Sequence, residues 1–311
     1  MKKNLFFLPL LLLLAGCGAD EIDSGNGGSG DNLQKYITTT VTVEDAVCTR
    51  GTPVNSVLQL TDFGFFCSYS GSALWDIATD VPNKMYNLKM VRNPSTGFWD
   101  YADGNLIAWD NVSAADHYTF FAYTPFATTT NGITVTSLAT TNGIPTLSYQ
   151  APGNVSYQPD LMIARARKDI HPTGHPVNLQ MKHALTAIGF EVSGKGEVIT
   201  GIAVTGISDQ AVLMMDAEQP DLWSNHGSLI TTYLSTNIYG GSYTANATPH
   251  NPLTADGFLM MIPQILTSDA KVRLTFSNNT NKDFDLTGGP LPTAWEAGKK
   301  VTYHINLNPP V

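Results

Sequence analysis

The sequence has few charged side chains and a shortage of basic ones. Only 14 % of its 311 residues are charged, against about a quarter in an average soluble domain. This scarcity excludes a coiled coil and a highly charged disordered chain. The 17 basic residues face 26 acidic ones, so the formal net charge is -9. Because binding to nucleic-acid phosphates needs a basic face, we expect no DNA or RNA partner.

Apolar runs long enough to cross a bilayer are also missing. The run Leu5–Leu14, after Lys2 and Lys3, spans about half of the roughly 20 residues that a membrane helix needs. A basic start and a short apolar stretch followed by small residues are typical of an export signal. The segment Leu14–Cys17 resembles a bacterial lipobox, which implies cleavage before Cys17 and diacylglycerol on its sulfur. An ordinary secretory signal with an incidental cysteine is the alternative.

The segment after Cys17 is a tether. Residues 17–35 are rich in Gly and Ser and have little apolar surface to bury, which is typical of a flexible linker. Without residues 1–16, which hold two lysines, 15 basic and 26 acidic groups remain, so the net charge of the exported chain is -11. Asp20 and Glu21 resemble the surface-export signal of some Gram-negative lipoproteins, and we therefore expect the outer face of the outer membrane.

No long segment carries the 3.6-residue apolar period of a helix, and a period of two dominates from Tyr36 onward. It predicts strands over 36–43, 118–123, 271–276 and 300–307. In the third, Val272, Leu274 and Phe276 are expected to face inward. Short strands in a chain of this length favour an all-β protein of sandwiches. Pro172 and Pro176 interrupt the pattern, which predicts domains over 36–172 and 173–311.

Candidate chemistry is sparse. His171 and His175 are four residues apart, but Pro172 and Gly174 exclude a helical metal pair, and a third ligand does not follow. Asp283 and Asp285 share one face of a predicted strand and are interpreted as a solvated surface. Arg165, Arg167 and Lys168 are interpreted as protection of an edge strand. We expect no catalytic residues, no metal and no cofactor, and therefore no enzyme.

Aromatic side chains and the remaining cysteines leave alternatives open. Five aromatic residues lie within about forty positions, and they could stack on sugars or pack a core: Tyr69, Trp75, Trp99, Tyr101 and Trp109. If Cys17 is acylated, Cys48 and Cys67 remain in an oxidising compartment. They either form a disulfide, which would contribute roughly 3 kcal/mol, or stay as two buried thiols.

Four segments, in order along the chain, resemble the fimbrillin family of lipoprotein-derived type V pilins and their minor subunits. They are Tyr118–Pro125, Pro159–Ala164, Pro176–Phe190 and Trp295–Ile305. The resemblance implies two tandem transthyretin-like β-sandwiches and assembly with other fimbrial subunits by strand exchange. In that family a protease cuts after an arginine, an N-terminal strand leaves, and a strand of the next subunit replaces it.

On this sequence the resemblance assigns the displaceable strand to 36–43, with Tyr36, Ile37, Val41 and Val43 as its apolar side chains. The matching cleavage site is the bond between Arg50 and Gly51, for which an ordinary loop is the alternative. The last strand is followed by Pro309 and Pro310, which cannot donate ladder hydrogen bonds. We therefore expect a subunit that accepts a strand without giving one, at the tip of a fimbria or as an accessory.

A disulfide between Cys48 and Cys67 would hold the cut strand in place, which would instead suit an anchor or a stand-alone lipoprotein. The rival function is a surface lipoprotein that does not polymerise and binds glycans or host ligands through its aromatic loops.

Overall fold

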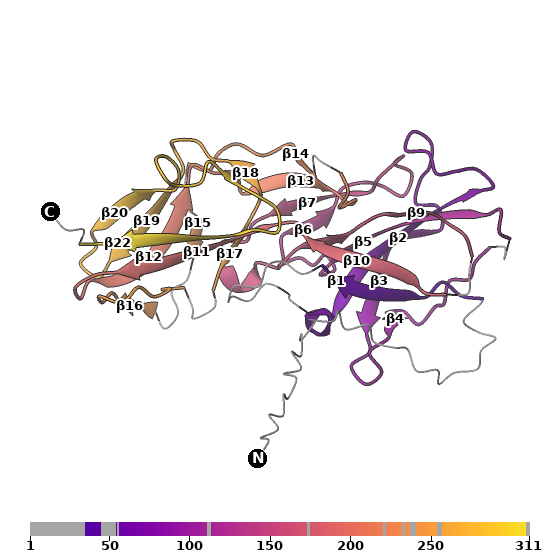
Figure 1. Cartoon of the computed structure of the whole chain (residues 1–311), viewed down its shortest axis with the longest axis horizontal. Coiled ribbons are helices and arrows are strands. Elements are labelled where there is room, and N and C mark those ends of the chain that lie inside the picture. The colour runs from indigo at the N-terminus through magenta and orange to yellow at the C-terminus, as the bar shows by residue number, and fades with distance from the viewer. Residues whose placement is uncertain are drawn as a thin grey trace, which may run out of the picture.

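A computed structural model describes residues 35–44, 54, 56–110, 113–172, 175–219, 222–231, 234–236, 241–253 and 257–308. These residues form strands, with two short 3-10 turns at η1 (Val57–Gln59) and η2 (Val155–Tyr157). The prediction of an all-β protein is confirmed. Within the described ranges, no helix is long and apolar enough to cross a bilayer. The molecule is elongated, and its two lobes lie end to end (Figure 1).

The first lobe is organised by one eight-stranded sheet. Its order is β1-β10-β8-β5-β2-β3-β4, with β9 paired to β5. The strands are β1 (Thr39–Val43), β2 (Asp62–Gly71), β3 (Met85–Arg92), β4 (Trp99–Tyr101), β5 (His117–Thr124), β8 (Met162–Ala164), β9 (Arg167–Ile170) and β10 (Val177–His183). The central strand β5 is buried from Tyr118 to Thr124, as expected for a continuous run of β-branched and aromatic residues.

Smaller sheets build the second lobe and the junction. The junction sheet has the order β14-β13-β7-β6, with β6 (Ile133–Val135), β7 (Thr146–Gln150), β13 (Gln210–Met214) and β14 (Trp223–Ser224). One sheet of the second lobe joins β17 (Leu259–Met261), β11 (Thr186–Ser193) and β22 (Lys300–Asn306). The other joins β15 (Leu234–Thr236), β12 (Val198–Thr205), β19 (Lys271–Phe276) and β20 (Asn281–Asp285), with β16 (Tyr243–Thr244) on β12. A last pair is β18 (Gln264–Ile265) and β21 (Ala294–Trp295).

The period-two pattern predicted strand faces as well as strands. In β19, Val272 and Leu274 are buried, and in β22 so are Tyr303 and Ile305, while His304 between them is exposed. Both predicted strands are therefore confirmed. The remaining inward candidate of β19, Phe276, is partly buried against the same core.

Two cores share the eight-stranded sheet, one on each of its faces. Adjacent side chains divide between them: Phe66 and Phe121 join the core that continues through the junction into the second lobe, whereas Phe65 and Phe120 join the core beneath β1. This second core also contains Ile37 and Val41. The segment predicted as displaceable thus contributes to one core of the first lobe only.

The expected division between residues 172 and 173 does not separate the sheets. β10, which follows that point, pairs with β1 and β8 of the first lobe. β7, which precedes it, pairs with β13. Hydrogen-bonded ladders therefore cross the boundary in both directions, and the division into two transthyretin-like units stays a prediction.

Candidate functional site

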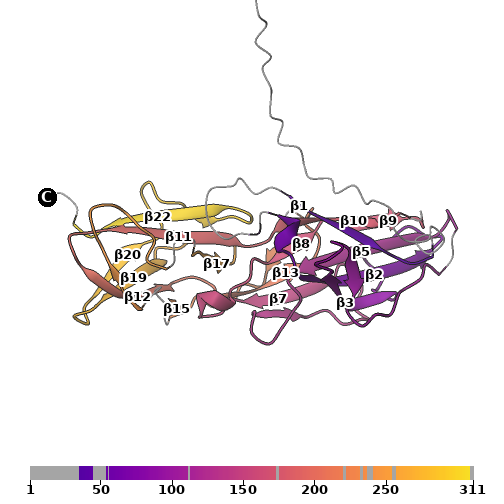
Figure 2. The ribbon, with the colours of Figure 1, turned by 90° about the horizontal axis from the view of Figure 1, so that it is seen from below.

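The strand predicted to be displaceable lies at the edge of the eight-stranded sheet. β1 pairs in parallel with β10, from Thr39 opposite Val177 to Val43 opposite Met181, and it is the terminal strand of the sheet order. The two views agree that β1 runs beside β10 at the margin of the first lobe (Figures 1 and 2). A terminal strand can leave without separating two other strands, which a central strand cannot do.

Burial along this segment alternates. Ile37 and Val41 are buried and belong to the core beneath the strand, while Val43 is half-buried against it. Tyr36 is half-buried and forms an isolated antiparallel bridge with Ala108. The segment therefore presents a buried inner face, apolar at Ile37, Val41 and Val43, and an exposed polar outer face, as a strand on one side of a core does.

The first residues of the segment are bonded to a second element. The Ile37 N–H donates to the Ile107 carbonyl at 2.8 Å, and the Trp109 N–H donates to the Lys35 carbonyl at 3.1 Å. The Tyr101 hydroxyl donates to the Ile37 carbonyl at 2.9 Å. Burial raises the pKa of Tyr101 well above its usual value, so the hydroxyl stays protonated as a donor. Any strand that replaces this one meets fixed main-chain partners at residues 107–109 and a fixed hydroxyl.

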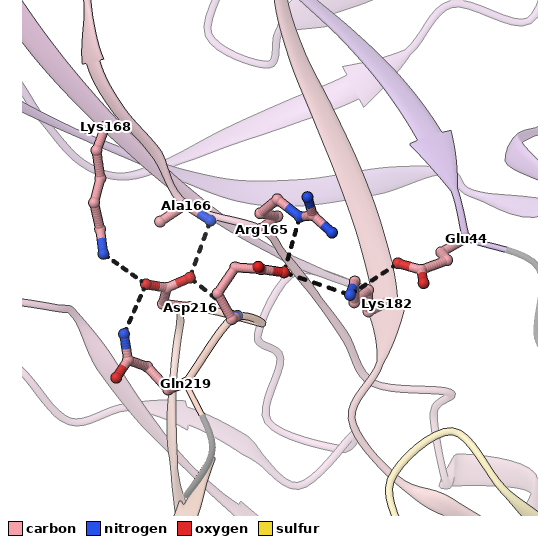
Figure 3. Close-up of polar contacts among 8 residues, drawn as sticks. Glu44, Arg165, Ala166, Lys168, Lys182, Asp216 and Gln219 are labelled. Atoms are coloured by element: carbon pink, nitrogen blue, oxygen red, sulfur yellow. Dashed lines mark hydrogen bonds and ion pairs between the residues drawn. The ribbon is translucent and has the colours of Figure 1, made fainter.

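The far end of β1 is tied to the junction by charges. Lys182 of β10 lies 3.1 Å from Glu44 and 3.5 Å from Glu218, and Arg165 lies 2.9 Å from Glu218 (Figure 3). These groups are each between about a quarter and a half exposed, so each pair is worth little by itself. They nevertheless link the end of the strand to the turn after β13.

That turn is fixed by a buried carboxylate, Asp216. Its Oδ1 accepts from the Ala166 and Glu218 N–H groups, both at 3.2 Å. Its Oδ2 accepts from Lys168 Nζ at 2.9 Å and Gln219 Nε2 at 3.1 Å (Figure 3). Burial alone would raise the pKa of Asp216, but the Lys168 ammonium and the other three donors outweigh it and hold that pKa below its ordinary value.

A second buried carboxylate holds the chain that follows the proposed cleavage loop. Asp160 Oδ2 accepts from the Val54 N–H at 2.7 Å, and Asp160 Oδ1 lies 3.0 Å from His183 Nδ1. The side chains of Asp160 and His183 are 5 % and 6 % exposed. Because Val54 is 106 positions from Asp160, this contact anchors the chain near residue 54 to the end of β10 independently of β1.

Several predicted site residues lie outside the described residues: Cys17, Cys48, Arg50 and Gly51. Lipidation, cleavage and the disulfide therefore stay predictions. Cys67 is described, and its side chain is fully buried in the core beneath β1. Burial raises the pKa of this thiol well above its usual value.

The aromatic group packs the core for the most part. Trp99, Tyr101 and Trp109 are all less than 9 % exposed, and Trp75 packs against the core. Core packing is therefore confirmed for Trp99, Tyr101 and Trp109, and their buried rings offer no platform for a sugar. Tyr69 alone of the group lines an open cavity of about 390 Å³, with Asn83, Lys84, Ile107 and Asp110. There Asn83 is already bonded to the Tyr69 main chain, and Lys84 to Asp110.

The other charged candidates form pairs. Asp283 binds Arg273 at 2.7 Å, and Asp285 binds Lys271 at 2.5 Å, on the outer face of β19 and β20. Within the described part of the chain, no group of three or more His, Cys, Asp or Glu side chains is placed to hold a metal ion. His171 Nδ1 lies 2.9 Å from the Asp116 carbonyl oxygen.

Sequence reasoning missed the two buried carboxylates. Asp160 and His183 stand in segments that carry the family resemblance, but nothing in the pattern pairs them. Asp216 follows the alternating strand β13 without any local signal, and the sequence pattern suggests only edge protection for its partner Lys168.

Comparison with known proteins gives one family and a set of related folds. A family model described as fimbrillin-like matches residues 63–311. A search of curated proteins gives no match. A fimbrial protein from Bacteroides vulgatus is similar in structure, with a TM-score of 0.60 at 19 % identity over 88 % of this chain and 95 % of that one. A proposed cell adhesion protein from Bacteroides ovatus has a TM-score of 0.58 at 13 % identity over 89 % and 94 %. Another from Bacteroides uniformis has 0.54 at 14 % identity over 89 % and 95 %.

Proposed function

Because the chain belongs to the fimbrillin-like family, we propose that it is a structural and adhesive subunit of a surface fimbria. In this proposal it joins other subunits by accepting a β-strand in place of its own first strand. The finer role in this proposal is that of a tip or accessory subunit.

The observation that carries the proposal is the position of β1. Among the described strands it is an edge strand with one neighbour, β10, and its inner face covers a core that includes Ile37 and Val41. Departure of β1 would expose the edge of β10 and an apolar slot together. An extended segment from another subunit can satisfy both, by main-chain hydrogen bonds along the edge and by side chains in the slot.

The contacts on either side of the proposed cleavage loop support a division there. Glu44 directly follows β1 and continues its pairing with β10, because its N–H donates to the Met181 carbonyl at 2.8 Å. Val54 after the loop is held by Asp160. A cut between Arg50 and Gly51 would therefore separate a segment held at the edge from a segment held by a buried carboxylate. Release of the first segment in this proposal requires that Cys48 and Cys67 are not joined by a disulfide.

Before cleavage, the proposal places the protein on the outer membrane through lipid on Cys17. Cys17 precedes the bond between Arg50 and Gly51, so the cut would free the subunit from the membrane when it enters the fimbria. The remaining chain would then be held only by its neighbours.

The test is limited cleavage of the full chain by an arginine-specific protease, followed by mass measurement without reductant. We expect one early cut after Arg50, followed by loss of the segment before it. The control is Arg50→Gln, which should abolish that cut and leave later sites unchanged. An early cut elsewhere, or a nicked chain whose first segment never dissociates even under mild denaturant, would contradict the proposal.

A further inference from the structure

The inner face of the segment 36–43, which contains β1, has a polar side chain between two apolar ones. Thr39 lies between Ile37 and Val41 and is 6 % exposed. Its hydroxyl is buried and has no hydrogen-bond partner among the described residues, and neither has the buried hydroxyl of Thr38. The residue opposite Thr39 on β10 is Val177, which is 4 % exposed and offers no polar side chain.

A buried hydroxyl without a partner destabilises the state that buries it. Water solvates the hydroxyl when the strand is out of the sheet, and nothing replaces that solvation when the strand is in place. Valine has the same shape as threonine but carries a methyl group in place of the hydroxyl, so it would fill the same space without that penalty.

The mismatch is specific to position. Thr40 and Thr42 belong to the same strand but face outward and are exposed, so water reaches them. Threonine at those positions suits a strand at a solvated edge, because β-branched residues favour extended backbone. Thr39 alone combines a core-facing position within β1 with a polar group.

We propose that β1 fits the slot beside β10 imperfectly because of the Thr39 hydroxyl. The slot fits better a strand of another subunit that has an aliphatic β-branched residue, Val or Ile, at the position of Thr39. The inference rests on the proposed function for the identity of the foreign strand as a segment of another subunit. That strand runs parallel to β10, as β1 does, because residues 107–109 and the Tyr101 hydroxyl meet its first residues.

The unpartnered hydroxyl of Thr39 favours replacement of β1 by an incoming strand over the reverse exchange. Main-chain bonds along β10 are the same for any extended occupant, so they do not distinguish the resident strand from an incoming one. The side chain at position 39 does distinguish them. An incoming strand with Val there is bound more tightly than the strand it replaces, and the exchange runs toward assembly without an external energy source.

The first experiment uses the intact chain and needs no partner. Thr39→Val should slow hydrogen exchange of the β1 and β10 main-chain amides by about fivefold to thirtyfold, because one or two kcal/mol changes an opening equilibrium by that factor. The matched control is Thr42→Val, the same substitution on the exposed face, which should leave these amides unchanged. Equal or faster exchange in Thr39→Val would overturn the inference.

The second experiment measures preference for an occupant. The probes are a synthetic peptide with the sequence of residues 35–44 and the same peptide with Val at the position of Thr39. Each competes with the resident strand on full chain nicked after Arg50 by an arginine-specific protease. We expect the Val peptide to bind about fivefold to thirtyfold more tightly. Equal binding would overturn the preference.

The two experiments separate the inference from the proposed function. If neither peptide enters and the resident strand never leaves the nicked chain, the proposed function fails. The exchange measurement on the intact chain still decides whether Thr39 weakens β1. If both peptides enter with equal affinity, the proposed function stands and the slot has no preference at this position.

Discussion

Replacing Asp216 by Asn should destabilise the junction between the lobes. The asparagine keeps one oxygen, which can still accept from the Ala166 and Glu218 N–H groups. Its amide nitrogen takes the place of Oδ2 and faces two donors, Lys168 Nζ and Gln219 Nε2, which lie 2.9 and 3.1 Å from that oxygen in the native protein. Two hydrogen bonds to a charged acceptor are lost, and a donor faces donors.

The magnitude follows from those two bonds. Hydrogen bonds to charged groups contribute about 1.5–3 kcal/mol each, but Lys168 is 37 % exposed and regains water when it loses its partner. We therefore expect Asp216→Asn to lower the free energy of unfolding by about 2–4 kcal/mol. Lys168→Met removes one donor and leaves the carboxylate with three, so its cost should be smaller, about 1–2 kcal/mol.

The pH dependence gives an independent check. The pKa of Asp216 is depressed in the folded protein. Its stabilisation is therefore fully present above the unfolded pKa of about 4 and is lost as pH falls through the lower folded value. The difference between native protein and Asp216→Asn should be constant from about pH 5 to 8 and shrink below about pH 4.

The assay is urea unfolding of both variants at several pH values. Asp103→Asn is the control, since that exposed carboxylate accepts hydrogen bonds from nearby Asn105 and its loss should matter far less. Equal costs for Asp216→Asn and Lys168→Met would refute the reasoning, because the ion pair alone would then carry the stabilisation. So would a difference that grows as the solution is acidified.

Three further predictions concern other residues. Gly64→Ala should destabilise the first lobe by about 3 kcal/mol or more, measured by urea unfolding, because its Cβ would lie 2.1 Å from the buried ring of Tyr123; a variant of native stability would contradict this packing. Cys67 should react with a neutral maleimide only after unfolding, since burial raises the pKa of its thiol; a mass gain in the native state would contradict its burial, and no gain in denaturant without reductant would indicate a disulfide. Asp160→Ala should speed hydrogen exchange at the Val54 amide by about tenfold or more, while the β1 amides change less; equal effects on both segments would show that Asp160 stabilises the lobe as a whole.

Much of the fold could be predicted from the sequence because strand periodicity is local. The pattern in 271–276 predicts both β19 and its buried face. It could not predict which strands are neighbours, because pairing depends on tertiary contacts. β10 follows the prolines that suggested a boundary, yet it pairs with β1 and β8.

The candidate site likewise has features that the local sequence pattern predicts and features that depend on tertiary contacts. Alternation from Ile37 to Val41 places Thr39 on the inner face, so that signal was present in the sequence. The anchors were not predictable, because Asp216 binds Lys168 over 48 positions and Asp160 meets His183 over 23. Tryptophan gives no signal of its own exposure, and only the fold shows that Trp99 and Trp109 are buried.

The place of β10 between β1 and β8 limits how the protein can be dissected in the laboratory. A recombinant fragment that stops at residue 172 would keep β1 but lack β10, the one strand paired with β1 among those that the structure describes. The complementary fragment would carry β10 with its partners removed, and its exposed edges would promote aggregation. Crystallisation, antibody mapping and binding studies on half-molecules should therefore use a break that leaves Val177–His183 with the amino-terminal piece.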